Sequence, residues 1–210
     1  MNITIICTGV PQQPVEGKYS SAGFDAAVLA ERDSGILPYS GRQYDAAERT
    51  VFVGEEVISR STAEQLILPC TPVVTPLANE IPLRSFADTE KLYPTETWLR
   101  KAAAQRRAGK PRQPESREAV IARADALIRK LEDAGGDSLL ITYPIFLAEL
   151  LDRFRVHNYV VQRGGLFRFQ PLEKIVVSRK DEHCGGCQHN CFLSNPGCGV
   201  GRDKAMRRRS

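Results

Sequence analysis

Residues 117–144, REAVIARADALIRKLEDAGGDSLLITYP, decide the fold. Apolar side chains recur at helical spacing through the first part, which predicts a helix over 117–133 with one buried face. That face consists of Val120, Ile121, Ala124, Leu127, Ile128 and Leu131. Ser116 can cap the start of the helix, and Gly135-Gly136 can end it. The apolar run at 138–143 then predicts a buried strand, so this stretch is a helix followed by a strand.

The rest of the chain repeats this alternation. Further strands are expected at 2–7, 50–53, 72–74, 166–169 and 173–178. Further helices are expected at 24–32, 55–67, 96–107 and 145–155, the last beginning after Pro144, and the remainder of 10–48 reads as a long loop. Such an alternation predicts an α/β layered fold with a mostly parallel sheet. Ligand sites in these sheets lie at the carboxyl ends of the strands, here Cys7-Thr8-Gly9 and Tyr143-Pro144.

Length and composition predict a soluble, cytoplasmic protein. The 210 residues suit one domain over 1–180 with a small appendage over 181–210, where the composition changes sharply. There is no basic segment followed by an apolar core at the start, and no apolar run of the roughly 20 residues that a membrane span needs. The net charge of +4 comes mainly from clusters at 100–112 and 202–209. Two short clusters are more typical of solvated surface than of a nucleic-acid interface.

Four short segments, in order, carry a resemblance to a known family. They read Ile6-Cys7-Thr8-Gly9, then Ser59-Arg60-Ser61-Thr62-Ala63, then the stretch 77–86 with Glu80, and finally Leu140 to Pro144. This order resembles the histidine phosphatase (phosphoglycerate mutase-like) superfamily over about residues 1–180. The resemblance implies a three-layer sandwich around a mostly parallel sheet, with a pocket at the ends of its strands.

The resemblance also shows what is missing. The family's nucleophilic histidine falls on Thr8, the arginine before it on Cys7, and the second histidine on Tyr143. The family's helix arginine falls on Ile58 in an ungapped alignment, which we prefer, and on Arg60 in a gapped one. Glu80 matches the family's acid/base residue. Phosphoryl transfer to an imidazole needs a nucleophile flanked by cationic donors, so the sequence predicts a catalytically inactive relative.

Two other uses of this pocket stay open. Cys7 could act as a new nucleophile assisted by Glu80, giving a hydrolase with altered chemistry, although no histidine is near it in sequence. Alternatively, Arg60, Arg84 and the basic stretch 100–112 could bind an anionic or phosphorylated small molecule. Ordinary packing at the strand ends and a solvated loop are the simpler interpretations.

A cysteine segment follows the predicted domain. Cys184, Cys187, Cys191 and Cys198 form the pattern C-x2-C-x3-C-x6-C. Four thiolates suit a tetrahedral zinc ion, and they also suit an iron–sulfur cluster. Disulfides or free thiols are the remaining alternatives, but the chain carries no export signal. The sequence therefore predicts a structural zinc site with His183 and His189 as neighbours, and it predicts Cys70 as a buried apolar residue rather than a ligand.

Three functions remain in competition at this stage. The first is a non-catalytic phosphatase-like protein that binds a ligand, regulates or scaffolds. The second is a hydrolase with altered catalytic residues. The third is a metal-dependent interaction or redox-sensing module, with a protein partner docking on the cysteine segment.

Overall fold

The computed structural model describes residues 1–41, 43–46, 49–67, 71–162 and 169–180. Chain contacts separate a unit Met1–Lys180 from a second unit Asp181–Ser210. All of the second unit lies outside the described residues, so the predicted metal-binding appendage stays a prediction.

The centre of the first unit is a six-stranded sheet in the order β4-β3-β6-β1-β8-β7. Its parallel part consists of β1 (Asn2–Cys7), β3 (Thr50–Val53), β4 (Val73–Val74) and β6 (Ser138–Thr142). The last two strands are β8 (Lys174–Arg179), antiparallel to β1, and β7 (Tyr159–Gln162), antiparallel to β8. The predicted mixed α/β fold with a mostly parallel sheet is confirmed.

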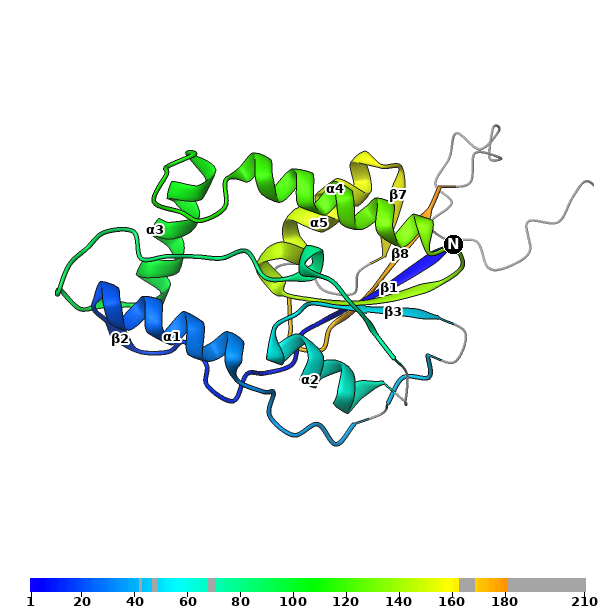
Figure 1. Cartoon of the computed structure of the whole chain (residues 1–210), viewed down its shortest axis with the longest axis horizontal. Helices are drawn as coiled ribbons and strands as arrows, with labels where there is room; N and C mark the ends of the chain where they lie inside the picture. The colour runs from blue at the N-terminus through cyan, green and yellow to red at the C-terminus, as the bar shows by residue number, and fades with distance from the viewer. Residues whose placement is uncertain (42, 47–48, 68–70, 163–168, 181–210) are drawn as a thin grey trace, which may run out of the picture. The chain divides into compact units, whose positions relative to one another are not determined.

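Helices lie on both faces of this sheet (Figure 1). The helices are α1 (Ser21–Asp33), α2 (Val57–Leu66), α3 (Thr95–Arg107), α4 (Arg117–Asp133) and α5 (Pro144–Val156), with a 3-10 turn η1 at Pro76–Ala78. Side chains of β1 on its two faces pack into two different hydrophobic cores. Ile3 and Ile5 pack with α4 and α5, whereas Ile6 packs with α2. Because successive strand residues point to opposite faces, both faces are apolar and both are covered.

The site depends on how β1 and β6 are paired. Cys7 lies beside Thr142 in the parallel register, so the two strands end at the same edge of the sheet. The chain leaves β6 through Tyr143 directly into α5, whose first residue is Pro144. Proline is favourable there because the first turn of a helix needs no hydrogen bond from that nitrogen.

Several predicted elements are shifted or missing. The long loop predicted within 10–48 contains a short strand β2 (Lys18–Tyr19), which pairs with β5 (Tyr93–Pro94). Of the predicted strand 166–169, residues 166–168 lie outside the described residues and Phe169 is not in a strand. β7, which we did not predict, is a short run whose pairing with β8 depends on tertiary structure. Within the described residues, no helix is long and apolar enough to cross a membrane.

Candidate functional site

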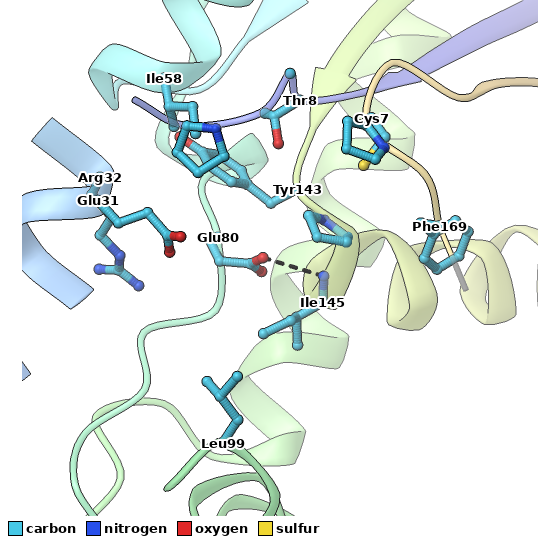
Figure 2. Close-up of a pocket in the computed structure, with 14 residues that line it drawn as sticks. Cys7, Thr8, Glu31, Arg32, Ile58, Glu80, Leu99, Tyr143, Ile145 and Phe169 are labelled. Atoms are coloured by element: carbon cyan, nitrogen blue, oxygen red, sulfur yellow. Dashed lines mark hydrogen bonds between the residues drawn. The ribbon is translucent and has the colours of Figure 1, made fainter. Parts of the chain in front are cut away.

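A pocket of about 230 Å³ lies at the carboxyl ends of β1 and β6. Its lining residues are Cys7, Thr8, Gly9, Pro11, Glu31, Arg32, Ile58, Glu80, Leu99, Tyr143, Pro144, Ile145, Phe169 and Pro171. Figure 2 shows how they surround Glu80, which lies between α1 and the start of α5. The pocket therefore occupies the edge of the sheet at which the sequence predicts a ligand site.

The end of β1 is held in place by backbone contacts. Thr8 N donates to Thr142 O at 3.0 Å, and Gly9 N donates to Thr62 Oγ1 at 3.1 Å. A Cβ on Gly9 would lie 2.8 Å from Ile36 Cδ1, so any larger residue would force Ile36 to move. Close packing against Ile36 therefore favours glycine at this position, whatever the function of the pocket.

Glu80 forms the centre of the site because its carboxylate caps α5. Glu80 Oε1 accepts from Phe146 N at 2.8 Å, and Oε2 accepts from Ile145 N at 3.2 Å. Oε1 also accepts from Ile81 N at 2.7 Å. The N-terminus of a helix presents free N–H groups and a partial positive charge, and so forms a ready site for an anion. In this protein the anion at that site is a side chain of the chain itself.

The ionisation of Glu80 is set by two opposing effects. Burial raises the pKa of the carboxyl group to about 7, against the three backbone N–H groups, which favour the charged form. The neighbouring Glu56 carboxylate contributes to this rise, after burial. Glu80 is therefore a mixture of charged and neutral forms near pH 7.

A second carboxylate, Glu31, lines the pocket from α1. Glu31 Oε1 accepts from Val15 N at 3.2 Å, and burial raises the pKa of this carboxyl group. Figure 2 shows the Glu31 side chain directed toward Glu80. Within the described residues, neither Glu31 nor Glu80 forms a salt bridge.

The arginine that lines the pocket is already paired. Arg32 Nε lies 3.4 Å from Glu56 Oε1, and Glu56 Oε2 accepts from Glu80 N at 3.2 Å. Glu56 therefore ties the guanidinium of α1 to the start of α2 and to the backbone of the Glu80 segment. A phosphate in this pocket would meet two carboxylates and a guanidinium whose charge is already balanced.

The thiol of Cys7 is poorly suited to nucleophilic attack. Cys7 is 2% exposed, and burial, followed by the charges of Glu80 and Glu173, raises its pKa to about 12. The thiolate is the reactive form of cysteine. At neutral pH the thiol is therefore protonated, and the carboxylate proposed to assist it disfavours its ionisation instead.

Tyr143, at the predicted second-histidine position, is 5% exposed. Its hydroxyl is buried near Glu56, and burial and the Glu56 carboxylate both raise the pKa of the phenol.

The predicted arginines lie elsewhere. Ile58 lines the pocket, whereas Arg60 is exposed on α2. Arg84 is 56% exposed, and its Nε lies 3.7 Å from Asp25 Oδ2. The stretch 100–112 forms the end of α3 and the turn after it. None of these arginines lines the pocket described above.

The histidine that the structure describes lies apart from the pocket. His157 follows α5, with Nε2 3.0 Å from Asp125 Oδ1. Cys70 and the predicted metal ligands Cys184, Cys187, Cys191 and Cys198 lie outside the described residues, as do His183 and His189. Among the residues that the structure does describe, no group of three or more His, Cys, Asp and Glu side chains could hold a metal ion.

Sequence reasoning missed Glu31, Arg32 and Glu56. Glu31 and Arg32 end a helix that the sequence indicates only weakly, and Glu56 begins α2 without capping it through its side chain. An acidic residue at a helix start is a common local feature. Only the tertiary fold brings these three side chains near Glu80.

Fold and pocket together define a mixed α/β protein with a pocket at the carboxyl ends of its parallel strands. No family model matches the sequence, and no curated protein matches it significantly. Solved structures with some likeness include the open reading frame Rv3214 of Mycobacterium tuberculosis, with 14% identity over 73% of this chain and 79% of that one. An Escherichia coli K-12 protein provisionally assigned as an alpha-ribazole-5'-P phosphatase shares 16% identity over 73% and 79%. TTHB049 of Thermus thermophilus shares 16% identity over 84% and 92%, and the TM-score is 0.49 for all three, which is too low to assign a family.

Proposed function

We propose that this chain is a non-catalytic, phosphatase-like protein that binds a small molecule in the pocket around Glu80. The observation that carries this proposal is the carboxylate of Glu80 on the N-terminus of α5. Those N–H groups could stabilise a transferring phosphoryl group if they were free. Because Glu80 occupies them, these N–H groups are not available to a phosphoryl group, while the pocket keeps a shape suited to a ligand.

The absence of a nucleophile supports the same proposal. Thr8 lies at the strand end where the family resemblance places a histidine, and the Cys7 thiol has a pKa of about 12. No histidine lines the pocket among the described residues. A protein with this pocket would bind or sense a ligand, in keeping with a regulatory or scaffolding role.

The test is hydrolysis of 4-nitrophenyl phosphate by the full chain between pH 5 and pH 9. We expect no turnover above that of a buffer control. Turnover that Cys7→Ser abolishes would favour a hydrolase with a cysteine nucleophile. Turnover that Glu80→Gln abolishes would favour a hydrolase in which Glu80 activates water.

A phosphorylated ligand, bound without turnover, is the second candidate for this pocket. The resemblance of the four sequence segments to a phosphatase family is the reason to consider a phosphorylated ligand. Arg32 is the pocket residue that could bind the phosphate group, if its ion pair with Glu56 were broken. Competition between inorganic phosphate and a bound probe measures this directly.

For residues 181–210 we propose a structural zinc site, with an iron–sulfur cluster as the alternative. The spacing of the four cysteines supports it, and a reducing cytoplasm would keep the thiolates available. A site in so short a segment would itself fold the segment. Elemental analysis of protein prepared without oxygen tests this: about one colourless zinc ion per chain supports the proposal. Iron with acid-labile sulfide would replace it with a redox-sensing module.

A further inference from the structure

The two carboxylates of the pocket can accept more hydrogen bonds than they do within the described residues. A carboxylate offers about four lone-pair sites. Glu80 uses three of them on backbone N–H groups, and Glu31 accepts from Val15 N. Both carboxylates can therefore accept further bonds from a donor inside the pocket.

The charges in the pocket favour a cation. Among the described residues, Glu31 and Glu80 line it, and the arginine that lines it, Arg32, pairs with Glu56. Glu56 also lies close enough to affect the ionisation of Glu80 and Tyr143. An ammonium group would supply three donors and a positive charge to carboxylates that form no salt bridge among the described residues. A phosphate ester would instead face two carboxylates at close range.

The remaining wall of the pocket is apolar. Ile58, Leu99 and Ile145 line it together with Phe169 and three prolines. Figure 2 shows Leu99 and Ile145 on the same side of Glu80 as each other, below the strand ends. The volume of about 230 Å³ is below the roughly 300–1,000 Å³ of pockets for drug-sized ligands. The wall therefore fits the hydrocarbon part of a small molecule.

We propose that the ligand of this pocket is a small organic amine, whose ammonium group bonds to Glu80 and Glu31 and whose apolar body packs against Ile58, Leu99 and Ile145. This inference rests on the proposed binding function and specifies its ligand class. It assigns to Glu80 a part in recognition in addition to its cap on α5. Charge, rather than shape alone, then selects the ligand.

The test uses three probes that share a benzyl group: benzylamine, benzyl alcohol and benzyl phosphate. Their binding to the full chain is measured by titration with NMR detection or calorimetry at pH 7.5. We expect benzylamine to bind about tenfold more tightly than benzyl alcohol, as the charge-assisted hydrogen bond predicts. Benzyl phosphate is expected to bind more weakly than either and not to be hydrolysed.

Variants show whether the carboxylates are responsible. Glu80→Gln keeps the size of the side chain and should reduce the preference for the amine over the alcohol about tenfold. Glu31→Gln leaves the cap on α5 in place and should reduce the preference for the amine over the alcohol severalfold. This variant therefore tests the inference even if Glu80→Gln folds poorly. The matched control is Asp133→Asn, an exposed carboxylate at the end of α4, which should leave all three affinities unchanged.

The outcomes separate this inference from the proposed function. Equal affinity for amine and alcohol, or tighter binding of unhydrolysed benzyl phosphate, overturns the amine inference and leaves a non-catalytic binding pocket. Hydrolysis of benzyl phosphate overturns the proposed function as well. Failure of the amine to bind also rejects the inference, as does an amine affinity that neither Glu→Gln variant changes.

Discussion

The N-termini of α4 and α5 meet the same physical requirement in different ways. At α4, Ser116 immediately precedes the helix, and its Oγ accepts from Ala119 N at 3.2 Å. At α5, Tyr143 precedes the helix and provides no side-chain cap. The N–H groups of Ile145 and Phe146 bond instead to Glu80, which is more than sixty residues earlier in the chain.

This difference shows how a helix end becomes part of a site. The cap on α4 is local and exposed, so it contributes only to the stability of one helix. The cap on α5 joins two distant segments and places a carboxylate in a pocket. A structural hydrogen bond and a candidate binding group are therefore the same side chain, and changes at Glu80 should affect both.

The largest expected effect is that of Glu80→Ala on stability. The substitution leaves three backbone N–H groups without their acceptor, and we expect the free energy of unfolding to fall by about 3 kcal/mol. Chemical denaturation of the variant and the wild type measures this. A loss no greater than that of Ser116→Ala would contradict the distinction between the two helix ends.

Added formate sharpens that test. If Glu80 occupies an anion site, then formate should restore part of the stability of Glu80→Ala by binding to the freed N–H groups. The same concentration of formate should leave wild type and Ser116→Ala unchanged, with chloride as the ionic-strength control. Equal stabilisation of all three proteins would show a general salt effect instead.

The second effect is the dependence of stability on pH. The pKa of Glu80 is about 7 in the folded protein and its ordinary value is 4.5, so the folded state holds this proton more tightly. Proton binding at Glu80 therefore stabilises the folded protein. This contribution is fully present below pH 4.5 and is lost as the pH rises through 7. Between pH 5 and pH 8 we expect a loss on the order of 2 kcal/mol, reduced from the full linkage value because Glu80 is partly exposed.

The matched variant for this effect is Glu80→Gln, which cannot titrate. Its stability should fall less than that of the wild type between pH 5 and pH 8. A smaller slope of the same sign should remain, because the pKa of Glu31 is also raised. Identical pH profiles for the two proteins would mean that Glu80 ionises normally.

A smaller effect is expected at the local cap. Ser116→Ala removes the acceptor for Ala119 N, and we expect a loss of about 1 kcal/mol. The exposed N–H group can bond to water, so the loss stays below that of Glu80→Ala. Thermal unfolding of the variant should show a changed pH dependence only in the acidic range where Glu118 titrates, because the backbone N–H of Glu118 and the Ser116 hydroxyl lower the pKa of that carboxyl group.

The smallest effect is expected for Ser116→Asp. Aspartate is as good a cap as serine and its charge is favourable at a helix N-terminus, so stability should change by less than about 0.5 kcal/mol. A larger loss would indicate repulsion between the new carboxylate and Glu118, whose carboxyl group bonds to the Ser116 hydroxyl. The same denaturation experiment measures all the Ser116 and Glu80 variants on one scale.

Much of the fold could be predicted because its signals are local. The helix α4 was predicted with its observed bounds, since both its apolar periodicity and its cap lie within 116–136. The strand β7 was missed because its four residues carry little signal until they pair with β8. The site was predicted in part: Cys7, Thr8, Gly9, Glu80 and Tyr143 all line the pocket, whereas Arg60 and Arg84 do not.

The sequence by itself determined the alternating strands and helices, the strand ends at Gly9 and Pro144, and the lack of a histidine at those ends. These features depend on residue identity and on short-range periodicity. Only the tertiary structure decided that Glu80 caps α5, that Glu56 neutralises Arg32, and that burial keeps the Cys7 thiol protonated. Each of these depends on distances between segments far apart in the chain, because hydrogen bonding, charge pairing and desolvation act through space and not along the sequence.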